Sequence, residues 1–298
     1  MALYDIIIIG GGPAGLSAAV YAARACLDTL LLEKQPMGGG QILNTAEVDN
    51  YLGFFDTNGF ELGQKFTEHA QHLGVKPLME EVVRIDCIGA VKKVVTEKQE
   101  YETKNIIYAA GAGHRKLGVP GEEEFAGKGV SYCATCDGAF FRGKTVAVIG
   151  GGDVALEDAL FLANVCRKVF LIHRRDTFRG AKTLVERVNA VENIETVVDT
   201  VAKEISGEDT VKGLVCMDVK TGGQKSLAVD GVFIAVGMVP HTQLLEGQVK
   251  LDQNGYVIAG EDCKASVDGV FAVGDVRTKK VRQIVTAVSD GAVAVTGI

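Results

Sequence analysis

The sequence predicts an α/β protein with two Rossmann-like nucleotide-binding units. A glycine-rich dinucleotide fingerprint occurs twice, at residues 10–15 and 150–155, and each copy lies between a buried β-branched run and a helix. The 298 residues suit about two domains of ~100–200 residues. Glycine is frequent and proline scarce, at 37 and 5 residues, as expected for a chain with many strand-to-helix turns.

The first unit covers residues 5–33. The run 6–9 is typical of a strand buried on both faces, and the turn Gly10-x-Gly12-x-x-Gly15 leads into a helix expected over residues 14–25. Gly10 makes the tight turn, Gly12 lets the backbone approach a pyrophosphate, and Gly15 lets helix and strand pack closely. Glu33 ends the next strand, where its carboxylate can accept a hydrogen bond from a ribose hydroxyl. The unit therefore predicts a dinucleotide site.

The second unit repeats this pattern over residues 145–173. A strand precedes the turn Gly150-x-Gly152-x-x-Ala155, and a helix and a second strand follow it. His173 lies 23 residues after Gly150, and Glu33 lies 23 residues after Gly10. The two units are therefore an internal repeat in one register.

The two repeats differ in charge at the end of their second strand. The first has an acid there, whereas the second has His173 followed by Arg174, Arg175 and Arg179. Guanidinium groups recognise a phosphate dianion through paired hydrogen bonds, and a carboxylate would repel it. We therefore expect the second unit to prefer NADPH to NADH; the alternative is a solvated basic turn. Asp153 and Glu157 do not occupy the ribose position.

A dithiol pair, Cys133 and Cys136, lies between the two units and is followed by Asp137. Such a pair binds zinc, joins two segments as a structural disulfide, or performs redox chemistry. Zinc needs four ligands, and no second pair supplies the other two. A carboxyl beside the sulfurs can supply and accept the proton of thiol–disulfide exchange, which favours redox chemistry. The other cysteines are expected to be packed core residues: Cys26, Cys87, Cys166, Cys216 and Cys263.

The remaining segments predict further elements. The glycine-rich segment 38–53 is either a surface loop or the wall of a flavin pocket. The others are an amphipathic helix over 60–73, an antiparallel meander over 80–103, a buried strand over 106–112, a linker over 115–129 with a solvated acidic run at 122–124, short strands over 191–232, a hairpin strand at 255–257, a strand over 269–275 that ends at an acid, and a final helix opened by Arg282 and Gln283.

Composition argues against several classes of protein. The net charge of −7 is unsuited to general nucleic-acid binding. No apolar run approaches the ~18 residues needed to span a membrane, and the start of the chain lacks the basic segment of a signal peptide. Seven cysteines with one closely spaced pair fit a reducing cytoplasm better than a secreted disulfide scaffold.

Over essentially its whole length the chain resembles the bacterial-type, low-molecular-weight thioredoxin reductases of the FAD/NADPH pyridine nucleotide-disulfide oxidoreductase family. The shared motifs are Gly-Gly-Gly-Pro-Ala-Gly at 10–15, Gly-Gly-Gln at 39–41 running to Asn50, the segment 115–122, Cys-Ala-Thr-Cys-Asp at 133–137, His-Arg-Arg with Arg179, Gly-Asp at 274–275 and Arg-Gln at 282–283. The resemblance departs at Ala110, where a threonine is usual, at Leu52, where a proline is common, and at Val154, where a small hydroxyl residue is common.

The resemblance implies two three-layer (ββα) Rossmann-like domains, the second inserted in the first. Residues 1–114 and 242–298 would bind FAD, and residues 115–241 would bind NADPH and carry the redox-active cysteines. It also implies a homodimer and thioredoxin as the protein substrate. One domain would rotate about linkers near 112–118 and 238–243, because dithiol and nicotinamide compete for one flavin face.

The resemblance carries over to individual residues. Cys136 would face the flavin, Cys133 would attack thioredoxin, and Asp137 would be the acid/base. The expected FAD-binding residues are Gly10, Gly12, Pro13, Ala14, Gly15, Glu33, Lys34, Gly40, Gln41, Asn50, Val83, Ala110, Gly111, Gly274, Asp275, Arg282, Gln283 and Ile284. The expected NADPH-binding residues are Gly150, Gly152, Asp153, Val154, Ala155, His173, Arg174, Arg175 and Arg179.

The predicted function is thioredoxin-disulfide reduction of the EC 1.8.1.9 type, with electrons passing from NADPH to FAD, to the Cys133–Cys136 disulfide and on to thioredoxin. No metal is expected. The alternatives are a dithiol oxidase that passes electrons to oxygen, a ferredoxin-driven thioredoxin reductase, and a non-catalytic redox sensor. The basic run after residue 172 argues against ferredoxin, since a ferredoxin-driven enzyme needs no 2′-phosphate site.

Overall fold

The computed structural model describes residues 3–45 and 48–298, so part of the segment expected as a loop or pocket wall over 38–53 lies outside the described residues. The chain divides into two compact units, Met1–Gly113 with Val239–Ile298, and His114–Met238. We call these the first and second units. Their breaks lie one and three residues from the expected boundaries after 114 and 241. Which nucleotide each unit binds stays a prediction.

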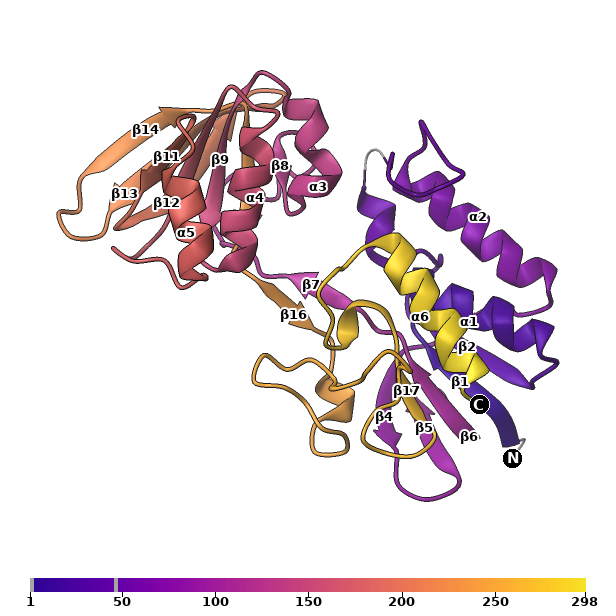
Figure 1. Ribbon diagram of the computed structural model, residues 1–298. Helices are drawn as coiled ribbons and strands as arrows, with labels where there is room; N and C mark the ends of the chain where they lie inside the picture. The colour runs from indigo at the N-terminus through magenta and orange to yellow at the C-terminus, as the bar shows by residue number, and fades with distance from the viewer. Residues whose placement is uncertain (1–2, 46–47) are drawn as a thin grey trace. The chain divides into compact units, whose positions relative to one another are not determined.

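The first unit is organised around a sheet with the strand order β3-β2-β1-β6-β5-β4, and β17 also pairs with β6 (Figure 1). Strands β1, β2, β3, β6 and β17 are parallel, and β4, β5 and the start of β6 form an antiparallel meander. The strands are β1 (Leu3–Ile9), β2 (Thr29–Glu33), β3 (Pro77–Met79), β4 (Val82–Asp86), β5 (Lys92–Thr96), β6 (Glu100–Tyr108) and β17 (Val270–Ala272).

Alternate residues of the strands point to opposite sides of this parallel sheet, and apolar residues cover both of its faces. Ile6 and Ile8 pack against the helices, and Ile7 and Ile9 pack on the other face. The helices are α1 (Pro13–Arg24), α2 (Gly59–His72) and α6 (Ile284–Thr296), with 3-10 turns at Gly40–Asn44, Gln243–Leu245 and Gly274–Val276. Helix α6, from the C-terminal part of the chain, lies beside α1 and shares a hydrophobic core with it (Figure 1).

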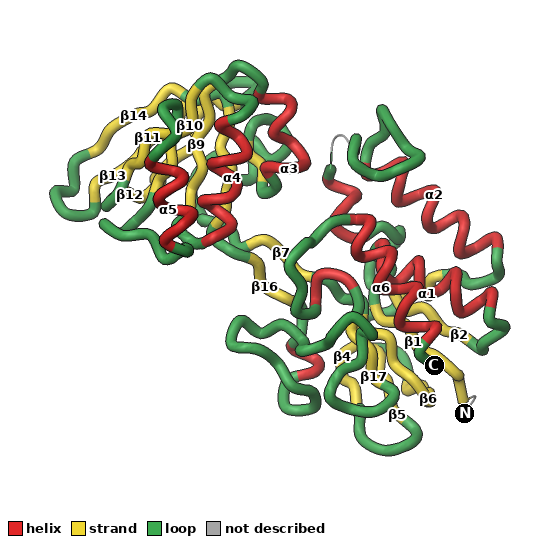
Figure 2. The backbone as a smooth tube through the Cα atoms, viewed as in Figure 1, coloured by secondary structure: helices red, strands yellow, loops and turns green. Residues whose placement is uncertain are grey.

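The second unit repeats the plan on a smaller scale (Figure 2). Its parallel sheet has the order β11-β10-β9-β15-β8, and a separate antiparallel sheet has the order β12-β13-β14. One apolar cluster lies between the two sheets, and another lies between the parallel sheet and the helices, which gives three layers. The strands are β8 (Val130–Ser131), β9 (Thr145–Gly150), β10 (Lys168–Ile172), β11 (Ile194–Val197), β12 (Thr200–Gly207), β13 (Val211–Asp218), β14 (Gln224–Ala228) and β15 (Gly231–Ala235). The helices are α3 (Ala134–Asp137), α4 (Asp153–Ala163) and α5 (Lys182–Asn189), with a 3-10 turn at Gly138–Phe141.

The chain passes between the units twice, through β7 (Ala112–His114) and β16 (Met238–Pro240). These two short strands pair with each other in a two-stranded sheet. The linkers therefore form a joined ribbon.

Three local expectations are wrong. Residues 255–257 do not form a strand, because Val257 makes only isolated bridges, to Leu251 and Arg277. Cys26 is exposed: α1 ends at Arg24, and Cys26 lies in the following turn with a left-handed φ of 57°. The acidic run 122–124 is not wholly solvated, because Glu122 is 2% exposed. Over residues 3–45 and 48–298, no helix has the length and apolar character to cross a membrane.

Candidate functional site

The first glycine turn is closed by backbone contacts that only glycine allows. A Cβ on Gly15 would lie 1.9 Å from the Gly10 carbonyl oxygen, so helix α1 packs directly on the turn. A Cβ on Gly40 would lie 3.1 Å from the Cα of Gly12, which places the segment after β2 against the same turn. Pro13 stands at the start of α1, where its missing N–H costs nothing, and Ala14 is buried behind it. The structure thus gathers the predicted pyrophosphate site at the N-terminus of α1.

Glu33 is buried at the end of β2 and is fixed to this turn. One carboxylate oxygen accepts the Gly11 N–H at 2.6 Å and the other accepts the Gln35 N–H at 2.8 Å. A carboxylate can accept further bonds at each oxygen, so its expected ribose contact is compatible with these two. Lys34 is exposed and pairs with Glu81 at 3.9 Å. Val83 stands at a register shift in β4, a bulge that re-aims the backbone.

The other predicted flavin residues lie around the loops at the carboxyl ends of the strands. The Gln41 side chain donates to the Ala112 carbonyl, beside Ala110 and Gly111. The Asn50 amide donates to Gln283 at 3.1 Å, and Gln283 caps helix α6. Ile284, the first residue of α6, packs against the small cluster formed by Ile42, Val48 and Leu62.

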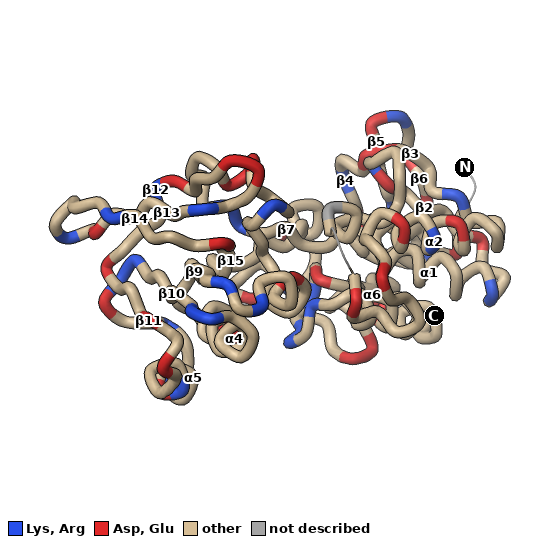
Figure 3. Tube along the Cα trace, turned by 90° about the horizontal axis from the view of Figure 1, so that it is seen from above, with Lys and Arg blue, Asp and Glu red and all other residues tan. Residues whose placement is uncertain are grey.

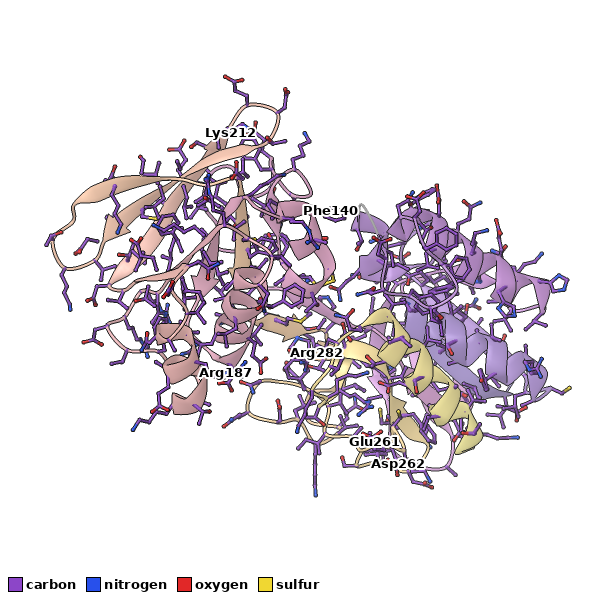
Figure 4. All side chains as sticks on the ribbon, turned by 45° about the horizontal axis from the view of Figure 1, so that its top comes forward. Phe140, Arg187, Lys212, Glu261, Asp262 and Arg282 are labelled. Carbon is purple, nitrogen blue, oxygen red and sulfur yellow. A yellow bond between two sulfur atoms is a disulfide. The ribbon has the colours of Figure 1, made fainter. Side chains whose placement is uncertain are left out.

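Within the described ranges, Asp275 and Arg282 each have a buried polar atom that is left without a hydrogen bond. Among the described residues, Asp275 Oδ1 and Arg282 Nε are buried without a hydrogen-bond partner. The Arg282 guanidinium lies 4.3 Å over the Tyr256 ring, at the entry to α6 (Figure 4). Buried polar atoms are almost always paired, so these two atoms suit a polar ligand. Together with the glycine turn they fit the polyol and phosphate groups of a flavin dinucleotide.

The second glycine turn holds His173 beneath it. A Cβ on Gly151 would lie 2.2 Å from the imidazole ring, and the ring stacks on Phe178 with centroids 5.3 Å apart. Burial lowers the pKa of His173, an effect increased by the three neighbouring arginines and opposed by a hydrogen bond with the Thr177 backbone. Its Nε2 has no partner among the described residues. The ring therefore presents a buried, unpaired nitrogen.

The segment after His173 is tied back to the same turn. The Arg179 N–H donates to the Gly151 carbonyl at 2.7 Å, and the Ala181 N–H donates to Asp153 at 2.7 Å. Arg174, Arg175 and Arg179 are exposed, and none of their side chains forms an ion pair with a described residue. Val154 is 61% exposed in the first turn of α4. The backbone of this segment is thus held at the turn, and its exposed guanidinium groups could bind an anion such as a 2′-phosphate.

Cys133 and Cys136 form a disulfide with their Cα atoms 5.3 Å apart. Cys133 precedes α3 and Cys136 lies within it, so one helical turn brings the two sulfurs together. The described residues contain no cluster of three or more His, Cys, Asp or Glu able to hold a metal ion.

Asp137 is fixed beside the disulfide by Ser131. The Ser131 hydroxyl donates to Asp137 Oδ2 at 2.6 Å and accepts the Cys133 N–H at 3.0 Å. Burial raises the pKa of Asp137, although the bond from Ser131 partly opposes it. Ser131 was not among the predicted residues, and it links the carboxyl to the backbone of the first cysteine.

Comparisons with known proteins agree with this geometry. The sequence pattern of the family described as pyridine nucleotide-disulphide oxidoreductase matches residues 4–291. The thioredoxin reductase of Treponema pallidum is 46% identical over 292 residues, covering 98% of this chain and 94% of the relative. The chain belongs to this family. Its similarity places it among the family's thioredoxin reductases.

Other relatives support the same placement. The thioredoxin reductase of Peptoclostridium acidaminophilum is 42% identical, covering 99% of this chain and 95% of its own. The crystal structure of thioredoxin reductase from Streptococcus pyogenes is 44% identical, has a TM-score of 0.93 and covers 99% of this chain and 97% of its own. The two-domain Rossmann-like fold predicted for the chain is thereby confirmed.

This thioredoxin reductase homologue has a buried charged cluster at α6 that the sequence analysis did not predict. Asp290, Arg277 and Lys279 have side chains at most 8% exposed, and both basic groups bond to Asp290. Asp290 also accepts the Gly274 N–H at 2.9 Å. An aspartate within the apolar run 284–296 was the available signal, since a buried carboxylate needs a partner. Its partners could not be named from spacing.

Glu122 is a second missed residue, and it organises the first linker. Its carboxylate accepts the Leu117 N–H at 3.0 Å, the Gly118 N–H at 2.7 Å and the Tyr132 hydroxyl at 2.8 Å. The Tyr132 ring also stacks on His114, with centroids 4.8 Å apart. Glu122 therefore ties the linker segment to the residue before Cys133.

Replacing Glu122 with glutamine should destabilise the second unit. The amide nitrogen would face an N–H group, so one partly buried hydrogen bond is lost at a cost of about 0.5–1.5 kcal/mol. Chemical unfolding followed by circular dichroism measures the change. Glu123→Gln is the matched control, because Glu123 is exposed and pairs only with Lys116 at the surface. An unchanged unfolding midpoint in Glu122→Gln would show that the network does not hold the linker.

Proposed function

We propose that this chain is an NADPH-dependent thioredoxin-disulfide reductase that uses FAD. The observation that carries the proposal is the Cys133–Cys136 disulfide with the half-buried Asp137 beside it, in the unit whose segment after β10 carries three arginines without an ion pair among the described residues. The curated relatives of near-complete coverage are named thioredoxin reductases, which supports the substrate. When bound, NADPH and FAD would supply the electron pair that opens the disulfide.

The first unit would hold FAD. The N-terminus of α1 would bind the pyrophosphate, Glu33 the ribose, and Asp275 the hydroxyl groups of the ribityl chain. Asn50 and Gln283 would border the flavin, since their side chains are hydrogen-bonded to each other at the start of α6, and Arg282 directly precedes Gln283.

The second unit would hold NADPH. Gly150, Gly152 and the start of α4 would bind its pyrophosphate. His173, Arg174, Arg175 and Arg179 would surround the 2′-phosphate, because they lie at the end of β10 beside the glycine turn. This assignment predicts discrimination against NADH.

The dithiol would reduce thioredoxin by two exchange steps. The reduced Cys133 sulfur attacks one sulfur of the thioredoxin disulfide, which forms a mixed disulfide and releases the other thioredoxin sulfur. Cys136 then attacks Cys133, which re-forms the Cys133–Cys136 disulfide and releases the second sulfur. Two electrons and two protons leave with thioredoxin. Asp137 would hold one of these protons at its carboxyl and pass it to the departing thiolate.

Asp137→Asn should lower kcat/KM for thioredoxin roughly 100-fold, because the carboxyl that moves the proton is gone. The pKa of Asp137 is raised by burial, so the carboxyl keeps its proton to a higher pH than an exposed aspartate. The donor is present below that pKa and lost as pH rises through it. The ratio of wild-type to variant activity should therefore fall with rising pH, measured in steady-state assays.

The same variant has an opposite effect on stability. Because the folded-state pKa is raised, ionising Asp137 costs folding free energy above the pKa of the unfolded chain. Asp137→Asn should thus be more stable than the wild type at neutral pH, and equally stable below about pH 3.9, where an unfolded aspartate is protonated. A less stable variant at neutral pH would contradict the assigned direction.

The proposal includes a homodimer and a cytoplasmic location. The free thiols fit a reducing compartment, since all five cysteines outside the redox pair are unbridged and four of them are buried. Figure 3 shows acidic and basic residues interspersed along both units, as expected for a protein that binds no nucleic acid.

A coupled steady-state assay tests the proposed function. NADPH oxidation should depend on oxidised thioredoxin and be accompanied by thiol formation. Oxygen consumption with a dithiol donor, without thioredoxin reduction, would indicate a dithiol oxidase. Thioredoxin reduction driven by reduced ferredoxin and not by NADPH would indicate the ferredoxin-driven class, and no turnover with any donor would indicate a sensor.

A further inference from the structure

Asp290 lies two turns into α6 and accepts four hydrogen bonds while only 5% exposed. Arg277 binds both of its oxygens, at 2.8 Å through Nε and 2.7 Å through Nη2. Lys279 donates to Oδ2 at 2.9 Å, and the Gly274 N–H donates to the same oxygen at 2.9 Å. Two buried cations and one backbone donor therefore converge on a single carboxylate.

The Gly274 bond connects this cluster to the turn that carries Asp275. Gly274 has a left-handed φ of 74°, and a Cβ there would lie 3.0 Å from Ala14 Cβ. The turn thus lies against the start of α1. Asp275 follows directly, and its Oδ1 is buried without a partner among the described residues.

Close packing fixes Asp290 relative to α1 as well. A Cβ on the adjacent Gly291 would lie 2.2 Å from the Ala14 carbonyl oxygen and 2.7 Å from the Ala18 nitrogen. Helix α6 therefore touches α1 backbone to backbone at this point. Arg282 and Gln283 directly precede this helix, with Gln283 as its N-cap, so α6 connects Asp290 to two residues predicted to bind the flavin dinucleotide.

We propose that Asp290 is a positioning residue of the flavin site: with Arg277 and Lys279 it clamps the Gly274 turn onto α6 and so aims Asp275 at the ligand. This inference rests on the proposed FAD site. Gly274 and Val276, the residues on either side of Asp275, are both buried, so the clamp acts on a turn that is packed on both sides of the Asp275 carboxyl. The clamp has a defined geometry, because Arg277 bonds both oxygens of the Asp290 carboxylate and each of these bonds is charge-assisted.

The clamp also sets the charge around Asp275. Burial raises the pKa of Asp275, Lys279 and Arg282 act in the opposite direction, and Asp290 adds a smaller raising effect. Burial disfavours the ionised form of Asp290, but the hydrogen bonds from Arg277 and Lys279 outweigh burial, so the pKa of Asp290 is lowered. Asp290 therefore stays ionised between Arg277 and Lys279, and Lys279 acts on Asp275 as well.

Asp290→Asn tests the proposal. The amide keeps the shape of the side chain but removes the charge and faces one buried cation with an NH₂ group. Apo-protein is titrated with FAD, followed by flavin fluorescence, and with ADP in competition. ADP reaches the glycine turn and Glu33 but has no ribityl chain. We expect the Kd for FAD to rise about tenfold or more and the Kd for ADP to change less than about threefold.

Two further variants distinguish positioning from general damage. Val270→Ala removes two buried methyl groups at the opposite end of β17 and should lower the unfolding midpoint without changing the ratio of the FAD and ADP dissociation constants. In the Asp275→Asn background, Asp290→Asn should weaken FAD binding by less than about threefold, since its effect passes through Asp275.

Equal weakening of FAD and ADP binding, unchanged FAD binding, or full additivity with Asp275→Asn would each overturn the proposal. Failure of wild-type apo-protein to bind FAD would instead overturn the proposed cofactor. The two failures are distinguishable because the first concerns the variants and the second concerns the unaltered chain.

Discussion

Replacing Cys136 with serine should abolish the proposed NADPH-dependent reduction of thioredoxin, by at least about 10⁴-fold, and should leave the proposed flavin reducible by NADPH. The disulfide can no longer form, so Cys133 has no intramolecular partner to resolve the mixed disulfide. Cys136 is not among the residues proposed to bind either nucleotide, so flavin reduction should be retained. Steady-state assays and the anaerobic absorbance of the flavin measure the two activities separately.

Cys26→Ser is the matched control for this loss. Cys26 is a free, exposed cysteine in the first unit, and its replacement should leave both activities unchanged. Cys133→Ser should also abolish thioredoxin reduction. Thioredoxin reduction retained in either active-pair variant would remove the dithiol from the route of the electrons, and loss of flavin reduction in Cys136→Ser would contradict the order in which they pass.

The double substitution Arg174→Ala with Arg175→Ala should raise KM for NADPH roughly 100-fold and leave KM for NADH within about threefold. Each charge-assisted hydrogen bond is worth about 1.5–3 kcal/mol, and the variant removes the groups that would make two of them. NADH lacks the phosphate that these groups would bind. The preference between the two nucleotides should therefore nearly vanish, measured by thioredoxin-dependent oxidation of each.

Arg187→Ala provides the control for net charge. Arg187 is an exposed arginine of α5 in the same unit (Figure 4), and its removal changes the charge without touching the turn after β10. Its KM for NADPH should match the wild type. An equal rise of KM for NADPH and NADH in the double variant would mean that the arginines do not recognise a 2′-phosphate.

The parts of the fold predicted from sequence are those with a local physical signature. The strand, glycine turn and helix around Gly10 and Gly150 follow from short-range steric demands, and the structure shows the close contacts that exclude a Cβ at Gly15, against Gly10, and at Gly150, against Ala155. The proximity of Cys133 and Cys136 follows from one helical turn. These features depend on residues adjacent in the chain, so the sequence contains the whole reason for them.

The missed residues depend on partners far apart in the chain or on unexpected backbone turns. Glu122 looked like part of an exposed acidic run, and its burial comes from Tyr132 and two linker N–H groups. Cys26 looked like a core cysteine within an apolar segment, yet α1 ends before it. Asp290 needed Arg277 and Lys279, which lie on a preceding irregular segment that has no periodic pattern.

Anaerobic titration of the purified yellow protein tests the central claim most directly. NADPH, and separately NADH, is added first, and oxidised thioredoxin follows. The account predicts bleaching of the flavin by NADPH, a weak response to NADH and return of the colour on addition of thioredoxin. Bleaching by NADPH without return of the colour would contradict thioredoxin as the acceptor, and the absence of bleaching by either nucleotide would contradict the assignment of His173, Arg174, Arg175 and Arg179.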